Sequence, residues 1–491
     1  MSRPNIVLVM TDQHRADFSQ LAGFGLDTTP FLDGLAGKGS YFPQAYTSSP
    51  ACVPARTSLL TGRFPSAHRV SQNSNAAQAY YSDDLLDVLR RAGYVLRFAG
   101  KPHMHAGPED FDSFAGPYSH TGGPVSSEGD AAFDQWLDGL DHGVSLDPTP
   151  FALENQLAYR IVTDSIEALS SSSASQPTFL WVSFPEPHNP YQVPEPYFSM
   201  FAEPDVPARL HGPQAAREKG GKWRWLQSLV ESKRPGYDGQ WRRYRANYCG
   251  ELRLLDDQIR RLVDHVEATL KGETLFIFLS DHGDYVGEYG LQRKGAGMPE
   301  CLIRIPMFFS GSTVHPGQVR RELVSIVDVL PTLCEVVGAP LPAGVQGRSL
   351  APLLVGRKAP AEEFDSVYAE SGFGGLTYGT DERPALHFAY EGPTFDELNT
   401  VTQSGRTSML RHGHHKLLVH SNGQGELYDL ASDPSEVVNL FDEPQVAHVR
   451  QELLWRLVQW LLRVRDDLPL GSYTIKTARH NWAGASQHPP A

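Results

Sequence analysis

The segment PNIVLVMTDQ, residues 4–13, joins an unbroken apolar run to two polar side chains, Asp12 and Gln13. A short apolar run of this kind, rich in branched residues and bounded by polar ones, is typical of a strand that is buried on both faces. Four later segments have the same character: residues 94–99 (YVLRFA), 178–184 (TFLWVSF), 274–279 (TLFIFL) and 306–311 (PMFFSG). The sequence therefore predicts five buried strands.

Segments with apolar residues at helical spacing lie between these strands. The two clearest are residues 81–94 and 248–272, and the first ends near Gly93, as helices often do. Strands that alternate with helices form a mostly parallel sheet with helices on both faces. We therefore expect an α/β fold with a mixed, mostly parallel central sheet that is sandwiched by helices.

The pattern changes towards the C-terminus. Residues 407–430 have the alternation of a hairpin, and residues 445–465 have the period of an amphipathic helix. We expect a catalytic domain over residues 1–380, with an insertion at about residues 196–245, and a smaller α+β domain over residues 381–491.

The composition excludes some classes of function. The chain has 491 residues, of which 40% are hydrophobic, and a formal net charge of -14. A protein this acidic has no overall attraction to nucleic acid or anionic lipid, although a local basic pocket can still bind a small anion. No apolar run approaches the roughly 20 residues of a membrane span, and the N-terminus enters the first strand without a signal peptide. We expect a cytoplasmic protein without nucleic-acid or membrane partners.

Polar side chains follow four of the predicted strands, at the point where each strand ends. They are Asp12 and Gln13, then Lys101 and His103, then His188, and finally Asp281 and His282. In an open α/β sheet, ligands bind in the crevice at the carboxyl ends of the strands. We therefore expect these side chains to line one site.

Four of these residues form a plausible metal site. The carboxylates of Asp12 and Asp281, the amide of Gln13 and the imidazole of His282 suit one hard or borderline divalent cation. The alternative is that each aspartate only caps the turn after its strand. The presence of both aspartates, with a lysine and histidines at neighbouring strand ends, favours the metal.

The segment CVPAR, residues 52–56, contains one of four scattered cysteines. The composition of the chain gives an expectation of about 0.02 Cys-x-Pro-x-Arg patterns by chance. The pattern resembles the signature of sulfatases, in which the cysteine is oxidised after translation to formylglycine. Five further blocks resemble sulfatase blocks in the same order: PNIVLVMTDQ, GKPHMH, PHNPY, LSDHGDYVGEYGL followed by Lys294, and GELYDLASDPSEVVNL.

On these motifs the chain is identified as a member of the sulfatase family of the alkaline phosphatase superfamily. The pairs Asp12-Gln13 and Asp281-His282 resemble those of the choline sulfatase and phosphonate monoester hydrolase branch. The resemblance implies an alkaline phosphatase-like fold, a formylglycine made from Cys52, and one divalent metal ion. Calcium is the expected ion, with manganese or magnesium as alternatives, and Cys52 would join the metal site.

The resemblance also implies roles for other residues: Arg56, Asn73, Lys101, His103, His188 and Lys294. Arg56 would hold the hydrated aldehyde in place. Lys101 and Lys294 would bind the sulfate oxygens, and His103 would act as general base. His188 would bind substrate or protonate the leaving alcohol, and Asn73 would contact substrate. A formylglycine-generating enzyme or its equivalent is an expected partner, and the branch forms homo-oligomers.

These observations predict a sulfatase that hydrolyses the sulfate ester of a small organic alcohol or sugar. A phosphonate monoester or phosphodiester hydrolase is the alternative, because the sulfuryl and phosphoryl groups are both tetrahedral and anionic. A third hypothesis is an inactive binding protein in which Cys52 stays a thiol. Two departures from the family pattern are Ala55, where serine is commoner, and Pro299-Glu300, where an aromatic-Glu pair often sits. We expect the second to alter local substrate contacts.

Overall fold

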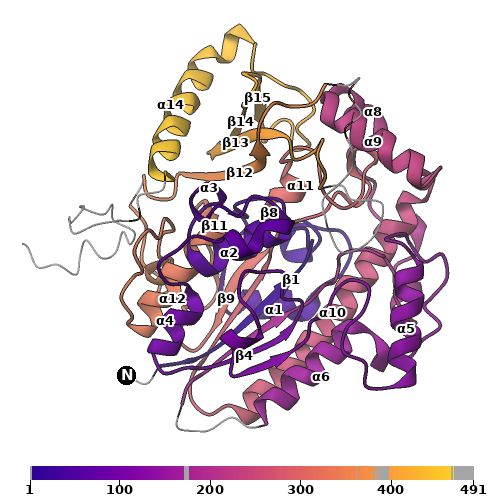
Figure 1. Ribbon diagram of the computed structural model, residues 1–491, viewed down its shortest axis with the longest axis vertical. Coiled ribbons are helices and arrows are strands. Elements are labelled where there is room, and N and C mark those ends of the chain that lie inside the picture. The colour runs from indigo at the N-terminus through magenta and orange to yellow at the C-terminus, as the bar shows by residue number, and fades with distance from the viewer. Residues whose placement is uncertain are drawn as a thin grey trace, which may run out of the picture.

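An eight-stranded sheet lies at the centre of the protein, in the order β10-β2-β9-β7-β1-β6-β4-β5 (Figure 1). The structure is a computed structural model, and it describes residues 3–170, 176–360, 362–379, 382, 384, 398–465 and 468. The four middle strands are parallel neighbours: β7 (Thr274–Ser280), β1 (Asn5–Thr11), β6 (Thr178–Ser183) and β4 (Val95–Gly100). The predicted buried strands and the mostly parallel sheet are confirmed.

The fifth predicted strand, β9 (Met307–Gly311), pairs antiparallel with β7 and makes the sheet mixed. The outer strands are short: β5 (Ser113–Ala115), β2 (Ser40–Tyr41) and β10 (Gln318–Val319). A second small sheet joins β11 (Val324–Ser325), β3 (Ala45–Tyr46) and β8 (Arg304–Ile305).

Alternate residues of β1 face opposite layers of helices, as the two-residue period of a strand requires. Val7 and Val9 pack in the cluster that contains α6 (Leu157–Leu169), α10 (Trp241–Thr269) and α1 (Pro30–Gly37). Ile6, Leu8 and Met10 pack with α2 (Cys52–Thr61), α4 (Leu85–Arg91) and α12 (Val329–Val337). The sheet is therefore buried on both faces, which explains its continuous apolar strands (Figure 1).

The remaining α-helices are short or peripheral: α3 (Pro65–His68), α5 (Glu128–Gly139), α7 (Tyr197–Met200), α8 (Pro213–Glu218), α9 (Gly221–Lys233), α11 (Glu300–Ile303) and α13 (Ala351–Leu354). Within the part of the chain that the structure describes, no helix has both the length and the apolar character needed to cross a bilayer.

A four-stranded antiparallel sheet forms the C-terminal part of the described chain. Its strands are β12 (Ser366–Gly374), β13 (Gly405–His412), β14 (His415–His420) and β15 (Gly425–Asp429), and α14 (Ala447–Arg463) packs against it. The predicted hairpin and helix are confirmed. The domain boundary at residue 380 stays a prediction, and β12, which precedes it, belongs to the small sheet.

The predicted insertion, residues 196–245, contains α7, α8, α9 and the first residues of α10. The indole of Trp223 on α9 packs edge-on against Tyr285 and Tyr289, with ring centroids 5.8 and 5.0 Å apart. These two tyrosines belong to the loop that follows β7. The segment therefore supports a loop at the carboxyl edge of the sheet.

Glu300, which belongs to the Pro299-Glu300 pair that departs from the family pattern, lies in a largely buried ion network. Its carboxylate is 2.9 Å from the Arg411 guanidinium and 3.2 Å from the Lys416 ammonium, and it accepts a hydrogen bond from the Tyr46 hydroxyl. Burial raises the pKa of Glu300, but Lys416 and Arg411 outweigh it and bring the pKa to about 2. Glu300 thus ties the central part of the protein to the C-terminal sheet.

We expect the substitution Glu300→Gln to lower the free energy of unfolding by about 3 kcal/mol, because it leaves the buried Lys416 without one of its partners. The folded state holds the carboxylate ionised, so its contribution is present above the ordinary pKa of 4.5 and is lost as the pH falls towards about 2. Apparent Tm measured at pH 7 and pH 3 checks this, since the wild-type advantage should shrink at pH 3. Glu452→Gln, at an exposed ion pair with Arg456, is the control and should change stability by less than about 1 kcal/mol. Equal effects of the two substitutions would contradict the assignment.

Candidate active site

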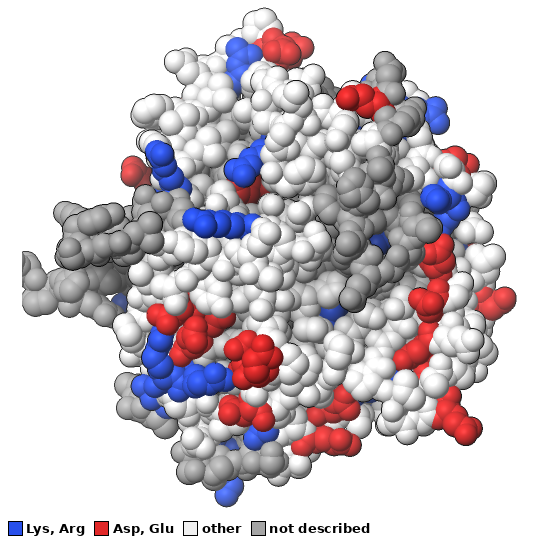
Figure 2. Space-filling view, viewed as in Figure 1, with Lys and Arg blue, Asp and Glu red and all other residues white. Residues whose placement is uncertain are grey.

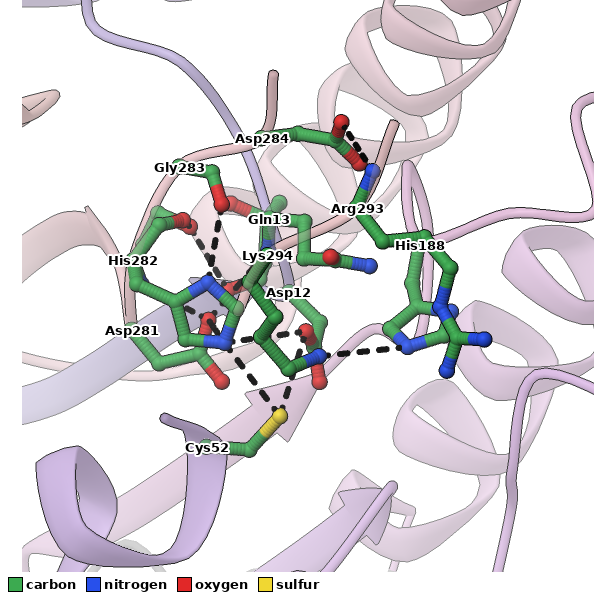
Figure 3. Close-up of polar contacts among 12 residues, drawn as sticks. Asp12, Gln13, Cys52, His188, Asp281, His282, Gly283, Asp284, Arg293 and Lys294 are labelled. Carbon is green, nitrogen blue, oxygen red and sulfur yellow. Dashed lines mark hydrogen bonds and ion pairs between the residues drawn. The ribbon is translucent and has the colours of Figure 1, made fainter. Parts of the chain in front are cut away.

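The carboxyl ends of the four parallel strands meet at one edge of the sheet, and the first residue of α2 lies against them (Figure 3). The predicted residues follow these ends: Asp12 and Gln13 after β1, Lys101 and His103 after β4, His188 after β6, and Asp281 and His282 after β7. Strands that are parallel neighbours must bring their following residues together, so the predicted convergence is present in the structure.

Cys52 begins α2 and is fully buried. Its Sγ lies 3.3 Å from Nε2 of His282 and 3.6 Å from Oδ1 of Asp12. Ligand atoms of Asp12, Cys52, Asp281 and His282 all lie within 4.8 Å of one another. The structure thus gathers four of the five predicted metal ligands around one point.

Gln13, the fifth predicted ligand, has a backbone conformation that non-glycine residues seldom adopt, with φ of 67°. Its backbone N–H donates to Oδ1 of Asp281 at 3.2 Å. Its side-chain Oε1 and Nε2 are buried, and neither has a hydrogen-bond partner among the residues that the structure describes. A buried amide oxygen without a donor, beside two carboxylates, fits a cation ligand.

His282 is oriented by its own loop. The ring contacts the Gly283 carbonyl through Nδ1 at 2.8 Å, which directs Nε2 at the cluster. Burial lowers the pKa of His282, but Asp281 and Cys52 raise it to about 9. Surroundings that stabilise a proton on this ring also favour a bound cation, so the residues present fit a divalent metal ion.

Arg56 binds both carboxylates from the same helix as Cys52. Its guanidinium lies 2.9 Å from Oδ2 of Asp281 and 3.4 Å from Oδ2 of Asp12, and it donates to the Ser183 hydroxyl at 2.6 Å. The ammonium of Lys101 lies 2.6 Å from the same Oδ2 of Asp12. Burial raises the pKa of Asp12, but these two cations hold it well below its ordinary value, so the carboxylate is ionised.

His188 and Lys294 lie beside each other in the site, with Nε2 of the ring 3.5 Å from Nζ of the lysine (Figure 3). Nδ1 of His188 contacts the Asn189 carbonyl at 2.7 Å, which places the proton on Nδ1. Burial, His120 and Lys294 hold the pKa of His188 well below its ordinary value. His188 is therefore neutral and presents a lone pair at Nε2 towards Lys294.

The last two predicted residues flank this centre. His103 is partly buried. Desolvation of the ring and, second, the charge of Lys101 hold the pKa of His103 well below its ordinary value, so the ring is neutral. Asn73 accepts a hydrogen bond from the backbone N–H of Val53 at 3.1 Å. Its side-chain oxygen therefore holds the start of α2, next to Cys52, where the sequence predicted a substrate contact.

Sequence reasoning missed His120 and His142, whose rings lie beside that of His188. The ring centroid of His120 is 4.4 Å from that of His188 and 4.6 Å from that of His142. Neither residue follows a strand of the central parallel group, so the strand-end rule did not indicate them. Arg293, the neighbour of Lys294, was missed because only the lysine belongs to a family block.

The fold and the site define a member of the alkaline phosphatase superfamily. A family model described as sulfatase matches residues 4–339. The arylsulfatase of Clostridium perfringens is 28% identical and covers 97% of this chain and 99% of its own length. The choline-sulfatase of Rhizobium meliloti is 26% identical, with coverage of 90% and 83%. The structure of the phosphonate monoester hydrolase of Agrobacterium radiobacter aligns with a TM-score of 0.76 over 94% of this chain and 96% of its own.

That structure is only 23% identical, so the likeness concerns the fold alone. The family match covers most of the chain, and the chain therefore belongs to the sulfatase family. It is a sulfuric ester hydrolase. The resemblance stated from the motifs and the alkaline phosphatase-like fold are both confirmed.

We expect a divalent cation to stabilise the metal-stripped protein and expect Asp12→Asn to abolish that effect, because the variant loses a charged ligand. A cation at 100 times its dissociation constant raises the free energy of unfolding by about 2.7 kcal/mol. The check is the shift in apparent Tm when calcium or manganese is added. Asp256→Asn is the matched control, since this buried carboxylate caps α1 through the N–H groups of Phe31 and Leu32 and should leave the shift unchanged. A full shift in the Asp12 variant would remove Asp12 from the metal site.

Proposed function

We propose that this sulfatase hydrolyses the sulfate ester of a small organic alcohol or sugar, with a formylglycine made from Cys52 as nucleophile. One observation carries the proposal: Cys52, at the start of a buried helix, lies within 3.6 Å of a carboxylate and an imidazole that end two different strands. A purely structural cysteine has no need of two strand-end ligands and an arginine that binds both carboxylates.

A formylglycine, made from Cys52 by a modifying enzyme, and a divalent metal ion taken up from solution would complete the site. The hydrated formylglycine offers two hydroxyls, one to attack sulfur and one whose deprotonation expels the sulfate as the aldehyde re-forms. A divalent ion, with calcium first and manganese or magnesium as alternatives, lowers the pKa of a hydroxyl and offsets developing charge when it is bound. Asp12, Gln13, residue 52, Asp281 and His282 would hold that ion.

The cationic side of the site would hold the sulfuryl oxygens. Lys101 and Lys294 are both almost completely buried, so their charges act at low dielectric. The net charge of -14 lies elsewhere: Figure 2 shows acidic side chains gathered where Figure 1 places α5, whose Glu128 and Asp138 are exposed. An acidic chain can therefore offer a locally positive pocket to an anionic ester.

Proton transfer would use two neutral histidines. His103, whose pKa is held low, is in the basic form that can accept a proton from a formylglycine hydroxyl. His188 is also neutral, and its Nε2 faces the ammonium of Lys294. We propose that the pair His188 and Lys294 binds the bridging oxygen and delivers the proton to the leaving alcohol, with the lysine as its source.

A phosphonate monoester or phosphodiester hydrolase is the second candidate. The observation in its favour is that Gln13 and His282, which resemble the phosphonate monoester hydrolase branch, both lie at the predicted metal site. Two carboxylates with a neutral amide and a neutral imidazole accept calcium or manganese. An unmodified Cys52 in the native host would favour the third candidate, an inactive binding protein.

We expect the peptide that contains residue 52 to carry an aldehyde when the protein is made in its native host or with a formylglycine-generating enzyme. Mass spectrometry detects this directly, since one sulfur and two hydrogens are replaced by one oxygen. The modified protein should have a higher kcat/KM for 4-nitrophenyl sulfate than for 4-nitrophenyl phenylphosphonate. Cys52→Ala should lower kcat/KM by at least about 10³-fold because it removes the nucleophile.

Cys334→Ala is the matched control, because this buried cysteine lies on α12 in the apolar core and should leave kcat/KM unchanged. A strong preference for the phosphonate would reverse the order of the two enzyme candidates. An active protein whose residue 52 stays a thiol would remove formylglycine from the proposal.

A further inference from the structure

Three buried imidazoles form a compact cluster beside the proposed sulfuryl site. The ring of His120 stacks on that of His188, with centroids 4.4 Å apart, while the ring of His142 lies 4.6 Å from His120 at a tilt of 39° and 6.2 Å from His188. Nδ1 of His120 and Nδ1 of His142 are buried and have no hydrogen-bond partner among the residues that the structure describes. Buried polar atoms without partners are uncommon in proteins, and a bound polar group is one explanation for them.

Two residues on the side of the site that carries these histidines have a strained backbone. Nine non-glycine residues have positive φ in the described ranges, and they include Gln13 and His103, which belong to the site already described. His142, with φ of 59°, and Arg293, with φ of 64°, share this feature. Conformations of this kind persist where the surroundings impose them, and they cluster at functional sites.

Specific contacts hold both strained residues in place. The carbonyl of His142 accepts hydrogen bonds from Arg234 at 2.8 Å and from the side chain of Asn189. The backbone N–H of Arg293 donates to Oδ1 of Asp284 at 2.8 Å. Figure 3 shows the Arg293 guanidinium next to the His188 ring, on the side away from the Lys294 ammonium. The structure thus fixes His142 and Arg293 on one wall of the site.

The charge of this wall decides what can bind to it. Ligand atoms of the three histidines lie within 4.8 Å of one another, so a metal ion is one possible occupant. The Lys294 ammonium, however, is 3.5 Å from Nε2 of His188, and Arg293 and Arg234 are further cations that act on His142. A cation would be repelled here. A second anion would instead meet one guanidinium and neutral rings that each offer an N–H donor.

We infer that Arg293, His120 and His142 form a second anion subsite, and that the preferred substrate carries a carboxylate or another sulfate on its alcohol half. The inference rests on the proposed function, because the first subsite is the one that binds the sulfuryl group. The two subsites meet at His188, because the ring of His120 stacks directly on the ring of His188.

Binding of sulfonates, whose C–S bond is not hydrolysed, tests this without relying on turnover. Isothermal titration calorimetry on the metal-loaded, formylglycine-containing protein compares benzenesulfonate with the 2-, 3- and 4-sulfobenzoate isomers. We expect at least one isomer to bind about tenfold or more tightly than benzenesulfonate, since it adds a charge-assisted hydrogen bond. The substitution Arg293→Gln should remove this advantage, and Arg293→Lys should keep part of it.

Arg91→Gln is the matched control. Arg91 is an exposed residue on α4, so this substitution removes the same charge far from the site and should leave the tighter binding of the sulfobenzoate isomer intact. The subsite is disproved if no isomer exceeds benzenesulfonate, or if Arg293→Gln weakens all four ligands equally. Zinc binding to the metal-stripped protein gives an independent check, since a second ion per chain that disappears in His142→Asn would assign the histidines to a metal instead. Loss of sulfatase activity with the sulfobenzoate preference intact would overturn the proposed function and leave the subsite standing.

Discussion

The pairing of Arg56 with two buried carboxylates is the interaction on which the rest of the site depends. Asp12, Asp281 and Arg56 all have no solvent exposure. Like charges in such a place are strongly unfavourable unless a cation lies between them, and loss of either partner leaves an uncompensated buried charge. Because Arg56 lies one helical turn after Cys52, this pairing also fixes where the nucleophile can be.

The guanidinium of Arg56 also holds α2 against the sheet through hydrogen bonds. Besides the two carboxylates, it donates to the Lys101 carbonyl and to the Ser183 hydroxyl, so it contacts the ends of β1, β4, β6 and β7. All ten residues of α2 are buried. The C-terminal part supplies some of that cover, since the ring of Phe64 just after α2 packs edge-on against Tyr368 of β12 and Trp460 of α14. The small sheet and its helix therefore stabilise the position of Cys52 from behind.

The strands and the strand-end residues could be predicted because both signals are local. A buried parallel strand such as β1 has a continuous apolar run, and the residue that follows it must lie at the carboxyl edge. Other features depend on packing between distant segments. Asn73 binds the backbone of Val53, Glu300 joins a network that is completed more than 100 residues later, and His120 reaches His188 from a loop. No periodicity or spacing encodes such contacts.

Residue 52 lies at the boundary between two oppositely charged halves of one site. On one side Asp281 and Cys52 outweigh the effect of burial and raise the pKa of His282 to about 9. On the other side burial, together with the charges of Lys101, Arg293 and Lys294, holds the pKa of His120 well below its ordinary value. The charged groups around His282 and those around His120 thus shift the two pKa values in opposite directions. The electrostatic potential therefore changes sign between the two rings. A cation is favoured on the first side and an anionic ester on the second, so a nucleophile held between them by α2 faces both at once.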